Sequence, residues 1–206
     1  MPVFEAIPAG RASRGVVVAQ DAFGVTDYLE GIATDLAEDG WIALAPSLYH
    51  RQGSPVIPFD QFPRAADYLV ALTGPGLLCD LDACLSHLAS QGIPASRTAV
   101  IGFCMGGTVA HFAAIERDIG AAVTFYGRAA ASGWEGVPPA NERAANLKAP
   151  WLGLFGEDDP LVPLDDVERL RVASEQASVP TKVICYPGAG HAFHRIATTT
   201  FICCAT

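Results

Sequence analysis

Residues 98–107 read Thr-Ala-Val-Ile-Gly-Phe-Cys-Met-Gly-Gly, and this stretch decides the fold. The β-branched apolar residues at its start predict a short buried strand, and the residues from Met105 to about Arg117 predict a helix. The turn between them has the pattern G-x-nucleophile-x-G, with Cys104 where serine usually stands. Its glycines remove Cβ atoms that would clash in so tight a turn.

Such a turn would present the Cys104 thiol at the end of the strand and at a helix N-terminus. The helix macrodipole stabilises a thiolate there, and the backbone N–H of Met105 would point at a developing oxyanion. The pattern alone also fits a glycine-rich helix start that buries a structural cysteine. The preceding strand and the partner residues downstream favour the nucleophile.

Short apolar runs alternate with longer helical patterns along the whole chain, which predicts a mostly parallel sheet covered by helices on both faces. We expect helices over 26–39, 62–72, 77–90 and 164–177, with a break at Gly74-Pro75-Gly76. The strands are expected at 15–20, 41–45, 98–103, 121–126, 151–155 and 181–186. At 206 residues the chain is expected to form one domain over 1–206.

Candidate acid and base residues follow the nucleophile in the order found in α/β-hydrolases. Asp159 follows the strand at 151–155 and precedes Pro-Leu-Val-Pro, and Asp158 is the alternative acid. His191 stands on the glycine-rich segment Pro187-Gly-Ala-Gly-His, with His194 as a weaker rival. His191 would take the proton of Cys104, and Asp159 would orient the imidazole ring.

Composition narrows the possible functions. The formal net charge of −9 argues against binding to nucleic-acid phosphates, and an anionic substrate would need its own arginines. No apolar run is long enough to span a bilayer, and the first residues, MPVFEAIPAG, do not resemble a signal peptide.

The six cysteines are expected to be free thiols in a reducing cytoplasm. No HExxH pattern or comparable ligand spacing predicts a metal site, and no cofactor is expected.

With these residues assembled, the chain resembles dienelactone hydrolases (carboxymethylenebutenolidases). The resemblance covers nearly the whole length. It rests on the segments VVVAQDAFGV, LAEDGWIALAPSLY, GFCMGG, TFYG, GEDDPLVP and GAGHAFHR. The cysteine in GFCMGG distinguishes this family from serine esterases.

The resemblance implies further site residues. Asp21 stands where the family typically has a glutamate that contacts the resting thiol and helps its activation, so the carboxylate here is one methylene shorter. The Ala22 N–H would be the second oxyanion donor beside Met105. Arg195 and the pair Arg64 and Tyr68 match residues that bind the substrate carboxylate, although the match at Arg64 and Tyr68 needs a short alignment gap.

The chain departs from the family at both termini. It begins close to the first core strand, without the family's N-terminal hairpin, and it ends in TTTFICCAT instead of a final amphipathic helix. Apolar sheet surface would then be exposed, so we expect a homodimer or reduced stability. Light scattering together with thermal unfolding tests this, and a monomer of ordinary stability counts against it.

The expected activity is hydrolysis of a small lactone or enol ester that bears a carboxylate, through a thioester on Cys104. Cysteine suits an enol lactone because its leaving group is stabilised, whereas alkyl esters and amides should be weak substrates. One alternative is a broad carboxylesterase or thioesterase, which Arg195→Ala would leave active. Another is a catalytically silent binding or redox protein in which Cys104 is an oxidisable thiol.

Overall fold

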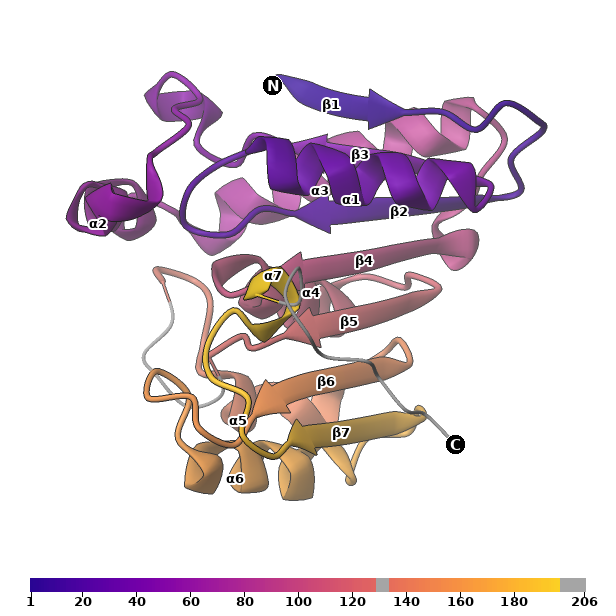
Figure 1. Ribbon diagram of the computed structural model, residues 1–206. Coiled ribbons are helices and arrows are strands. Elements are labelled where there is room, and N and C mark those ends of the chain that lie inside the picture. Colours follow the sequence, from indigo (N-terminus) through magenta and orange to yellow (C-terminus); the bar gives the residue numbers. More distant parts are fainter. Residues whose placement is uncertain (129–133, 197–206) are drawn as a thin grey trace.

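The computed structural model describes residues 1–128 and 134–196, and in this part the chain forms one seven-stranded sheet in the order β1-β3-β2-β4-β5-β6-β7 (Figure 1). All neighbouring strands are parallel except β1, which runs antiparallel to β3. The strands are β1 (Val3–Ala6), β2 (Arg14–Ala19), β3 (Trp41–Pro46), β4 (Thr98–Phe103), β5 (Ala121–Phe125), β6 (Trp151–Gly156) and β7 (Thr181–Tyr186).

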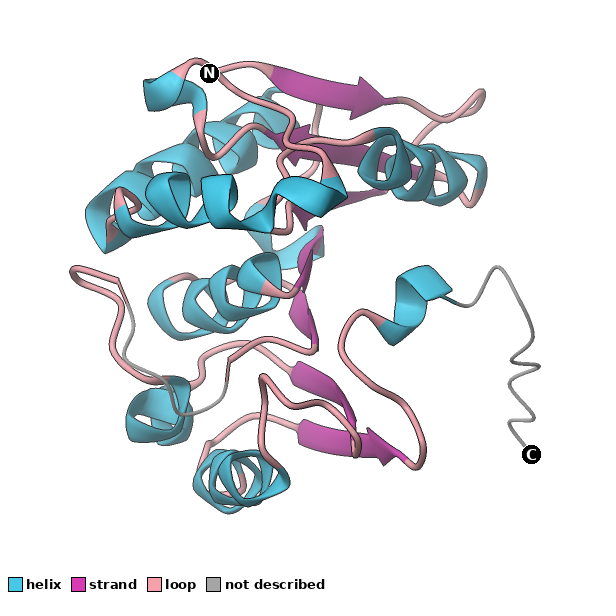
Figure 2. Ribbon diagram, turned by 60° about the vertical axis from the view of Figure 1, so that its left-hand side comes forward, coloured by secondary structure: helices cyan, strands magenta, loops and turns pink. Residues whose placement is uncertain are grey.

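Seven α-helices connect or flank the strands in the described ranges. They are α1 (Asp27–Glu38), α2 (Phe62–Val70), α3 (Gly74–Ser90), α4 (Met105–Glu116), α5 (Ala140–Arg143), α6 (Leu164–Ser174) and α7 (Phe193–Ile196). Figure 2 shows α3, α4, α5 and α6 on one side of the sheet, with α1 and the short α7 on the other. The mostly parallel sheet with helices on both faces that the sequence predicts is confirmed.

The six expected strands are present, each within one residue of its expected ends. Two local predictions need correction. Gly74-Pro75-Gly76 does not precede the helix but forms its first turn, because Thr73 caps the helix by accepting a hydrogen bond from the Gly76 N–H at 3.2 Å. The strand β1 was missed because four residues give too short an alternating pattern.

The sheet separates two apolar layers. Val17, Val100 and Ala122 point toward α3 and α4, whereas Val16 and Val18 on the opposite face pack against Leu29 of α1. A third cluster covers the carboxyl ends of the strands, where Tyr49 and Ile57 pack against Met105 at the start of α4. The turn after β4 is therefore held between packed layers.

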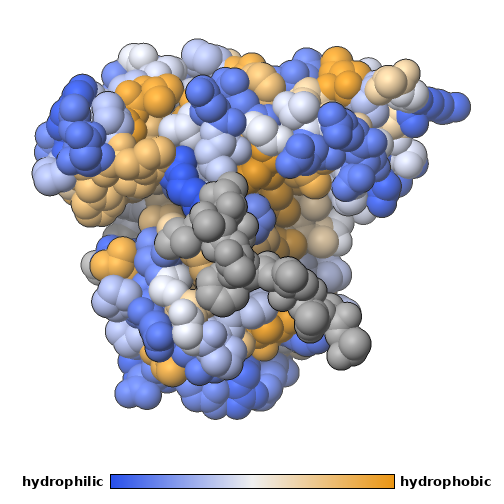
Figure 3. Space-filling view, in the orientation of Figure 1, coloured by the Kyte–Doolittle hydropathy of each residue, from blue (hydrophilic) through white to orange (hydrophobic). Residues whose placement is uncertain are grey.

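The face of the sheet that carries α1 is only partly covered over β4–β7. Ala99, Ile101, Val123, Leu152 and Ile184 are half-buried there, and the pairing register makes them neighbours across the strands. Figure 3 shows apolar surface below α1. The tail TTTFICCAT lies outside the described residues, and the expected dimer or lower stability stays a prediction. No helix in the described ranges is long and apolar enough to cross a membrane.

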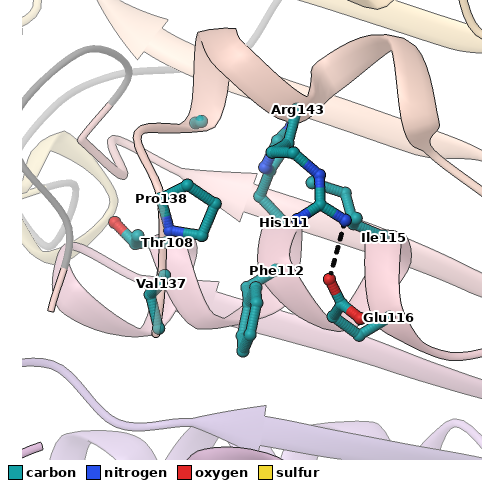
Figure 4. Close-up of a pocket in the computed structure, with 9 residues that line it drawn as sticks. Thr108, His111, Phe112, Ile115, Glu116, Val137, Pro138 and Arg143 are labelled. Carbon is teal, nitrogen blue, oxygen red and sulfur yellow. Dashed lines mark hydrogen bonds and ion pairs between the residues drawn. The ribbon is translucent and has the colours of Figure 1, made fainter. Parts of the chain in front are cut away.

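A small cavity lies between α4 and the 137–143 segment (Figure 4). Its volume is about 10 Å³, which admits about one water molecule and no organic substrate. Its lining comprises Thr108, His111, Phe112, Ile115, Glu116, Val137, Pro138, Ala140 and Arg143. Of these, Arg143 pairs with Glu116 at 3.0 Å, and the buried His111 packs edge-on against Trp151 without a hydrogen bond to Nε2.

Burial lowers the pKa of His111 to about 4, so folding requires its neutral form. Because the folded pKa lies below the unfolded one, this contribution is complete above pH ~6.5 and is lost as the pH falls toward 4. At pH 5 the loss should be about 2 kcal/mol.

We expect His111→Leu to remove that part of the pH dependence. Urea unfolding of both proteins at pH 7 and pH 5 measures it. If His111→Leu loses as much stability between the two pH values as the wild type, the assignment to His111 is wrong.

Candidate active site

Cys104 lies between β4 and α4 in a backbone conformation that few residues adopt. Its φ is +53° and its ψ is −114°, and its own N–H donates to the Phe125 carbonyl oxygen at 3.0 Å. Non-glycine residues with positive φ carry local strain, which persists only where the surroundings enforce it. The first turn of α4 supplies part of that enforcement, since the Cys104 carbonyl accepts from Gly107 N–H at 3.0 Å.

Two glycines make this turn possible. A Cβ atom on Gly102 would lie 2.0 Å from the Gly106 carbonyl oxygen, and one on Gly106 would lie 2.2 Å from the Ala19 carbonyl oxygen. Both neighbours are backbone and cannot move aside as a flexible side chain would. The glycines of the sequence pattern therefore meet a steric need of this structure.

Burial raises the pKa of the Cys104 thiol to about 12. A hydrogen bond from the Met105 backbone N–H lowers the pKa, the charges of Asp21 and Asp159 raise it, and the charge of Arg128 lowers it. The sequence led us to expect that the helix N-terminus stabilises a thiolate, but desolvation raises the pKa by more than the hydrogen bond from Met105 lowers it. The resting group is a neutral thiol.

His191 and Asp159 are in direct contact. The His191 Nδ1 and the Asp159 Oδ2 are 2.7 Å apart, and the other oxygen of Asp159 accepts from the Leu161 N–H at 2.8 Å. Asp159 is buried, whereas Asp158 is exposed and only its backbone N–H is engaged, with the Ala189 carbonyl. Of the two candidate acids, Asp159 is the one that can orient His191.

The other imidazole nitrogen of His191 has no partner. Nε2 is buried and makes no hydrogen bond within the described residues, and none joins it to the Cys104 sulfur. The ring packs edge-on against Tyr126, with centroids 5.0 Å apart. A buried polar nitrogen without a partner is costly in a resting structure and is typical of a site that acts on an incoming group.

The rival His194 has a different environment. Its Nδ1 lies 2.6 Å from the Tyr28 hydroxyl, and its ring packs against Phe103 and Phe125. Burial lowers its pKa, which favours the neutral imidazole. These contacts anchor α7 to the sheet and give His194 no carboxylate partner.

Two backbone N–H groups are candidates for binding an oxyanion. Met105 is the first residue of α4, so its N–H has no acceptor within the helix. Ala22 is buried next to the end of β2, and its carbonyl accepts from the Tyr49 hydroxyl at 3.2 Å. Within the described residues the Ala22 N–H donates to no backbone or side-chain acceptor, so it is free to bind an oxyanion.

Asp21 and Arg195 form an ion pair. The Arg195 Nη1 lies 3.2 Å from the Asp21 Oδ2, and Oδ1 accepts from the Phe23 N–H at 2.8 Å. The Arg195 guanidinium also lies over the rings of Phe59 and Tyr28, at 3.4 and 4.5 Å from their centroids. Burial raises the pKa of Asp21, and the hydrogen bond from Phe23 and the charge of Arg195 partly offset that increase.

The predicted pair of Arg64 and Tyr68 makes fewer contacts with the strand-to-helix turn at Cys104, which we call the elbow. Both lie on α2, where Arg64 is exposed and donates to the Gln61 side chain at 2.8 Å. Tyr68 packs against Tyr49, with ring centroids 5.4 Å apart. No contact in the described residues brings Arg64 to Asp21, Arg195 or Cys104.

Several residues near the site were missed in the sequence. Tyr126 follows β5 with a φ of +41° and contacts His191, and the rings of Phe59 and Tyr28 lie against the Arg195 guanidinium. The strand pattern includes Tyr126 but does not reveal its turn. The rings around Arg195 come from segments remote in the chain, so no local pattern marks them. Among the described residues, no group of three or more His, Cys, Asp or Glu side chains is arranged to hold a metal ion.

Comparison with known proteins gives a consistent result. A model described as the dienelactone hydrolase family matches residues 1–200. A Salmonella typhimurium protein provisionally named carboxymethylenebutenolidase is 36% identical over 201 residues, covering 94% of this chain and 73% of that protein. The carboxymethylenebutenolidase of Pseudomonas sp. strain P51 is 31% identical over 200 residues, covering 95% and 80%.

A solved structure agrees with these relatives. The crystal structure of a provisionally named dienelactone hydrolase from Klebsiella pneumoniae has a TM-score of 0.87 and 32% identity. The superposition covers 98% of this chain and 86% of that one.

The contrast between Asp159 and its neighbour gives a matched pair of variants. Asp159→Asn should lower kcat for ester hydrolysis on the order of 10³-fold, because His191 loses the group that orients its ring and stabilises its charge. Asp158→Asn removes the same charge one residue away and should change kcat by less than about twofold.

Steady-state kinetics of the two variants measures this difference, and circular dichroism checks that both are folded. Equal losses in the two variants, or a larger loss in Asp158→Asn, would contradict the assignment of Asp159.

Proposed function

Since the chain belongs to the dienelactone hydrolase family, and is a hydrolase that cleaves esters, we propose that it opens a small carboxylate-bearing lactone or enol ester through a thioester on Cys104. The observation that carries this proposal is that three groups follow the carboxyl ends of strands β4, β6 and β7 of the parallel sheet. They are a cysteine in a strained strand-to-helix turn, a histidine with a free buried Nε2, and a carboxylate 2.7 Å from its Nδ1.

The reaction begins with a neutral thiol, because burial raises the pKa of Cys104 to about 12. The sulfur becomes nucleophilic only when its proton leaves, and the Nε2 atom of His191 accepts that proton. Asp159 keeps the His191 ring in the tautomer whose Nε2 is free and stabilises the imidazolium that forms.

The thiolate adds to the lactone carbonyl, and the N–H groups of Met105 and Ala22 bind the oxyanion. The carbon–oxygen bond of the ring then breaks, and the enolate leaving group takes the proton from the His191 imidazolium, which becomes neutral again. An acyl thioester remains on Cys104. His191 next removes a proton from water, which attacks the thioester and releases the free acid and the thiol.

We assign two roles to the pair of Asp21 and Arg195. Arg195 binds the carboxylate of the substrate, in exchange for its contact with Asp21. Asp21, once released, helps to remove the thiol proton, and its raised pKa makes it a better base than an exposed aspartate. Arg64 and Tyr68 remain candidates for the far end of the substrate.

The first test of the function compares two substrates and three proteins. The wild type should hydrolyse a dienelactone much faster than p-nitrophenyl acetate, and Cys104→Ser should lose at least about 10³-fold in kcat for the lactone. Arg195→Ala should raise KM for the lactone while sparing p-nitrophenyl acetate.

The broad carboxylesterase becomes the better account if Arg195→Ala leaves both reactions intact. If the wild type turns over neither compound, the hydrolytic proposal is wrong.

A second test separates the two effects of Asp21. Asp21→Asn removes a negative charge near the sulfur, so the Cys104 pKa should fall and alkylation by iodoacetamide at pH 8 should speed up by roughly fivefold. The same variant lacks the base and should hydrolyse the lactone more slowly. Asp21→Glu should keep both properties close to the wild type.

Rapid alkylation together with undiminished turnover in Asp21→Asn would show that this carboxylate does not act as a base. Mass spectrometry of the Cys104 peptide distinguishes its alkylation from that of the other cysteines.

A further inference from the structure

Arg128 lies against the first turn of the helix that begins at the nucleophile. It follows β5 by three residues, and its backbone N–H donates to the Thr108 Oγ1 at 3.1 Å. Thr108 is one helical turn after Cys104, and its N–H donates in turn to the Cys104 carbonyl oxygen at 3.3 Å. Arg128 and Cys104 are therefore linked through a single residue of α4.

The segment after β5 and the first turn of α4 approach each other closely, and this approach depends on a pair of glycines. A Cβ atom on Gly127 would lie 2.7 Å from the Gly107 carbonyl carbon, and one on Gly107 would lie 3.0 Å from the Gly127 Cα. Tyr126 turns the chain at this point with a φ of +41°, and its N–H is held by the Leu154 carbonyl at 2.8 Å. The backbone of Arg128 thus has a fixed position at the carboxyl edge of the sheet, beside the elbow.

The charge of Arg128 acts on the nucleophile. It lowers the pKa of Cys104, whereas the charges of Asp21 and Asp159 raise it. The Arg128 side chain is exposed, and within the described residues it takes part in no ion pair. It is therefore available to an anion that approaches the sulfur.

The other two arginine candidates are less available. Arg195 already pairs with Asp21 at 3.2 Å and lies over two aromatic rings, and Arg64 lies on α2, where it donates to the Gln61 side chain at 2.8 Å. The chain as a whole carries a net charge of −9, so the overall electrostatic field of the protein repels an anionic substrate. A cation beside the elbow is needed to offset that repulsion.

We propose that Arg128 forms an anion subsite of this enzyme and selects substrates with a carboxylate near the bond that is cleaved. The inference rests on the proposed function and deepens it, because it adds a specificity-determining residue to the same site. The Arg128 guanidinium binds the carboxylate from the side of α4, while Arg195 lies on the side of α7 and Asp21. A substrate with two anionic groups can engage both.

Charge-selective alkylation tests the subsite without any substrate. Iodoacetate and iodoacetamide both react with the thiolate, so the ratio of their rates at one pH does not depend on the fraction ionised. Arg128→Gln should lower the ratio of iodoacetate to iodoacetamide rates at Cys104 by about fivefold at low salt, and by less in 0.5 M salt, where the screening length is about 4 Å. Arg128→Lys should keep most of the wild-type ratio.

A matched control removes one arginine from the opposite edge of the sheet. Arg97 is exposed and precedes β4, and its guanidinium donates to the Gly92 carbonyl oxygen, so Arg97→Gln should leave the ratio unchanged. An unchanged ratio in Arg128→Gln, or equal decreases in Arg128→Gln and Arg97→Gln, would overturn the subsite.

Hydrolysis completes the test. With dienelactone and its methyl ester, Arg128→Gln should lower kcat/KM for the acid by about tenfold and change that for the ester by less than about twofold. If the wild type hydrolyses neither compound but the alkylation ratio falls in Arg128→Gln, the subsite stands and the lactone substrate is wrong. If the lactone is hydrolysed and neither readout responds to Arg128→Gln, the function stands and the subsite is wrong.

Discussion

The site depends on how closely two backbone segments approach each other at the end of β4. Gly106 lies against the carbonyl oxygens at the end of β2, and Gly102 lies against the first turn of α4, at distances that exclude any Cβ. Cys104 lies between these contacts with a φ of +53°. The N–H of Met105, the first residue of α4, has no acceptor within the helix and donates to the Cys104 sulfur. The nucleophile and one oxyanion donor are thus products of a single steric constraint.

Electrostatics then determines the protonation state of the Cys104 thiol before substrate binds. Removal of water raises the pKa of the Cys104 thiol to about 12, and two nearby carboxylates act in the same direction as burial. A neutral resting thiol is less exposed to oxidation and alkylation than a thiolate, since the thiolate is the reactive form. The positive charges of Arg195 and Arg128 lie on different segments around it. In this account, an anionic substrate changes the balance of charge at the sulfur when it binds.

The parallel sheet and the candidate nucleophile, acid and base could be predicted from the sequence, because short segments of the chain specify each of them. The strand TAVIGF, the turn at Cys104 and the order of Asp159 and His191 are each contained in short segments, and the parallel sheet brings their ends to one edge. The resting state of the thiol could not be predicted in this way. Its pKa depends on burial by residues from several strands and loops, which raises it, whereas the helix N-terminus alone favours a lower pKa. The aromatic rings around Arg195 and the position of Arg128 depend on tertiary contacts for the same reason.

The central claim is that Cys104 carries the acyl group, and trapping that group tests it most directly. The wild type is mixed with dienelactone and quenched in acid within milliseconds to seconds, and the Cys104 peptide is analysed by mass spectrometry. We predict a transient increase equal to the mass of the lactone on Cys104, which disappears as product forms and persists longer in Asp159→Asn. Turnover without an adduct on Cys104, and equally fast in Cys104→Ala, would contradict the account.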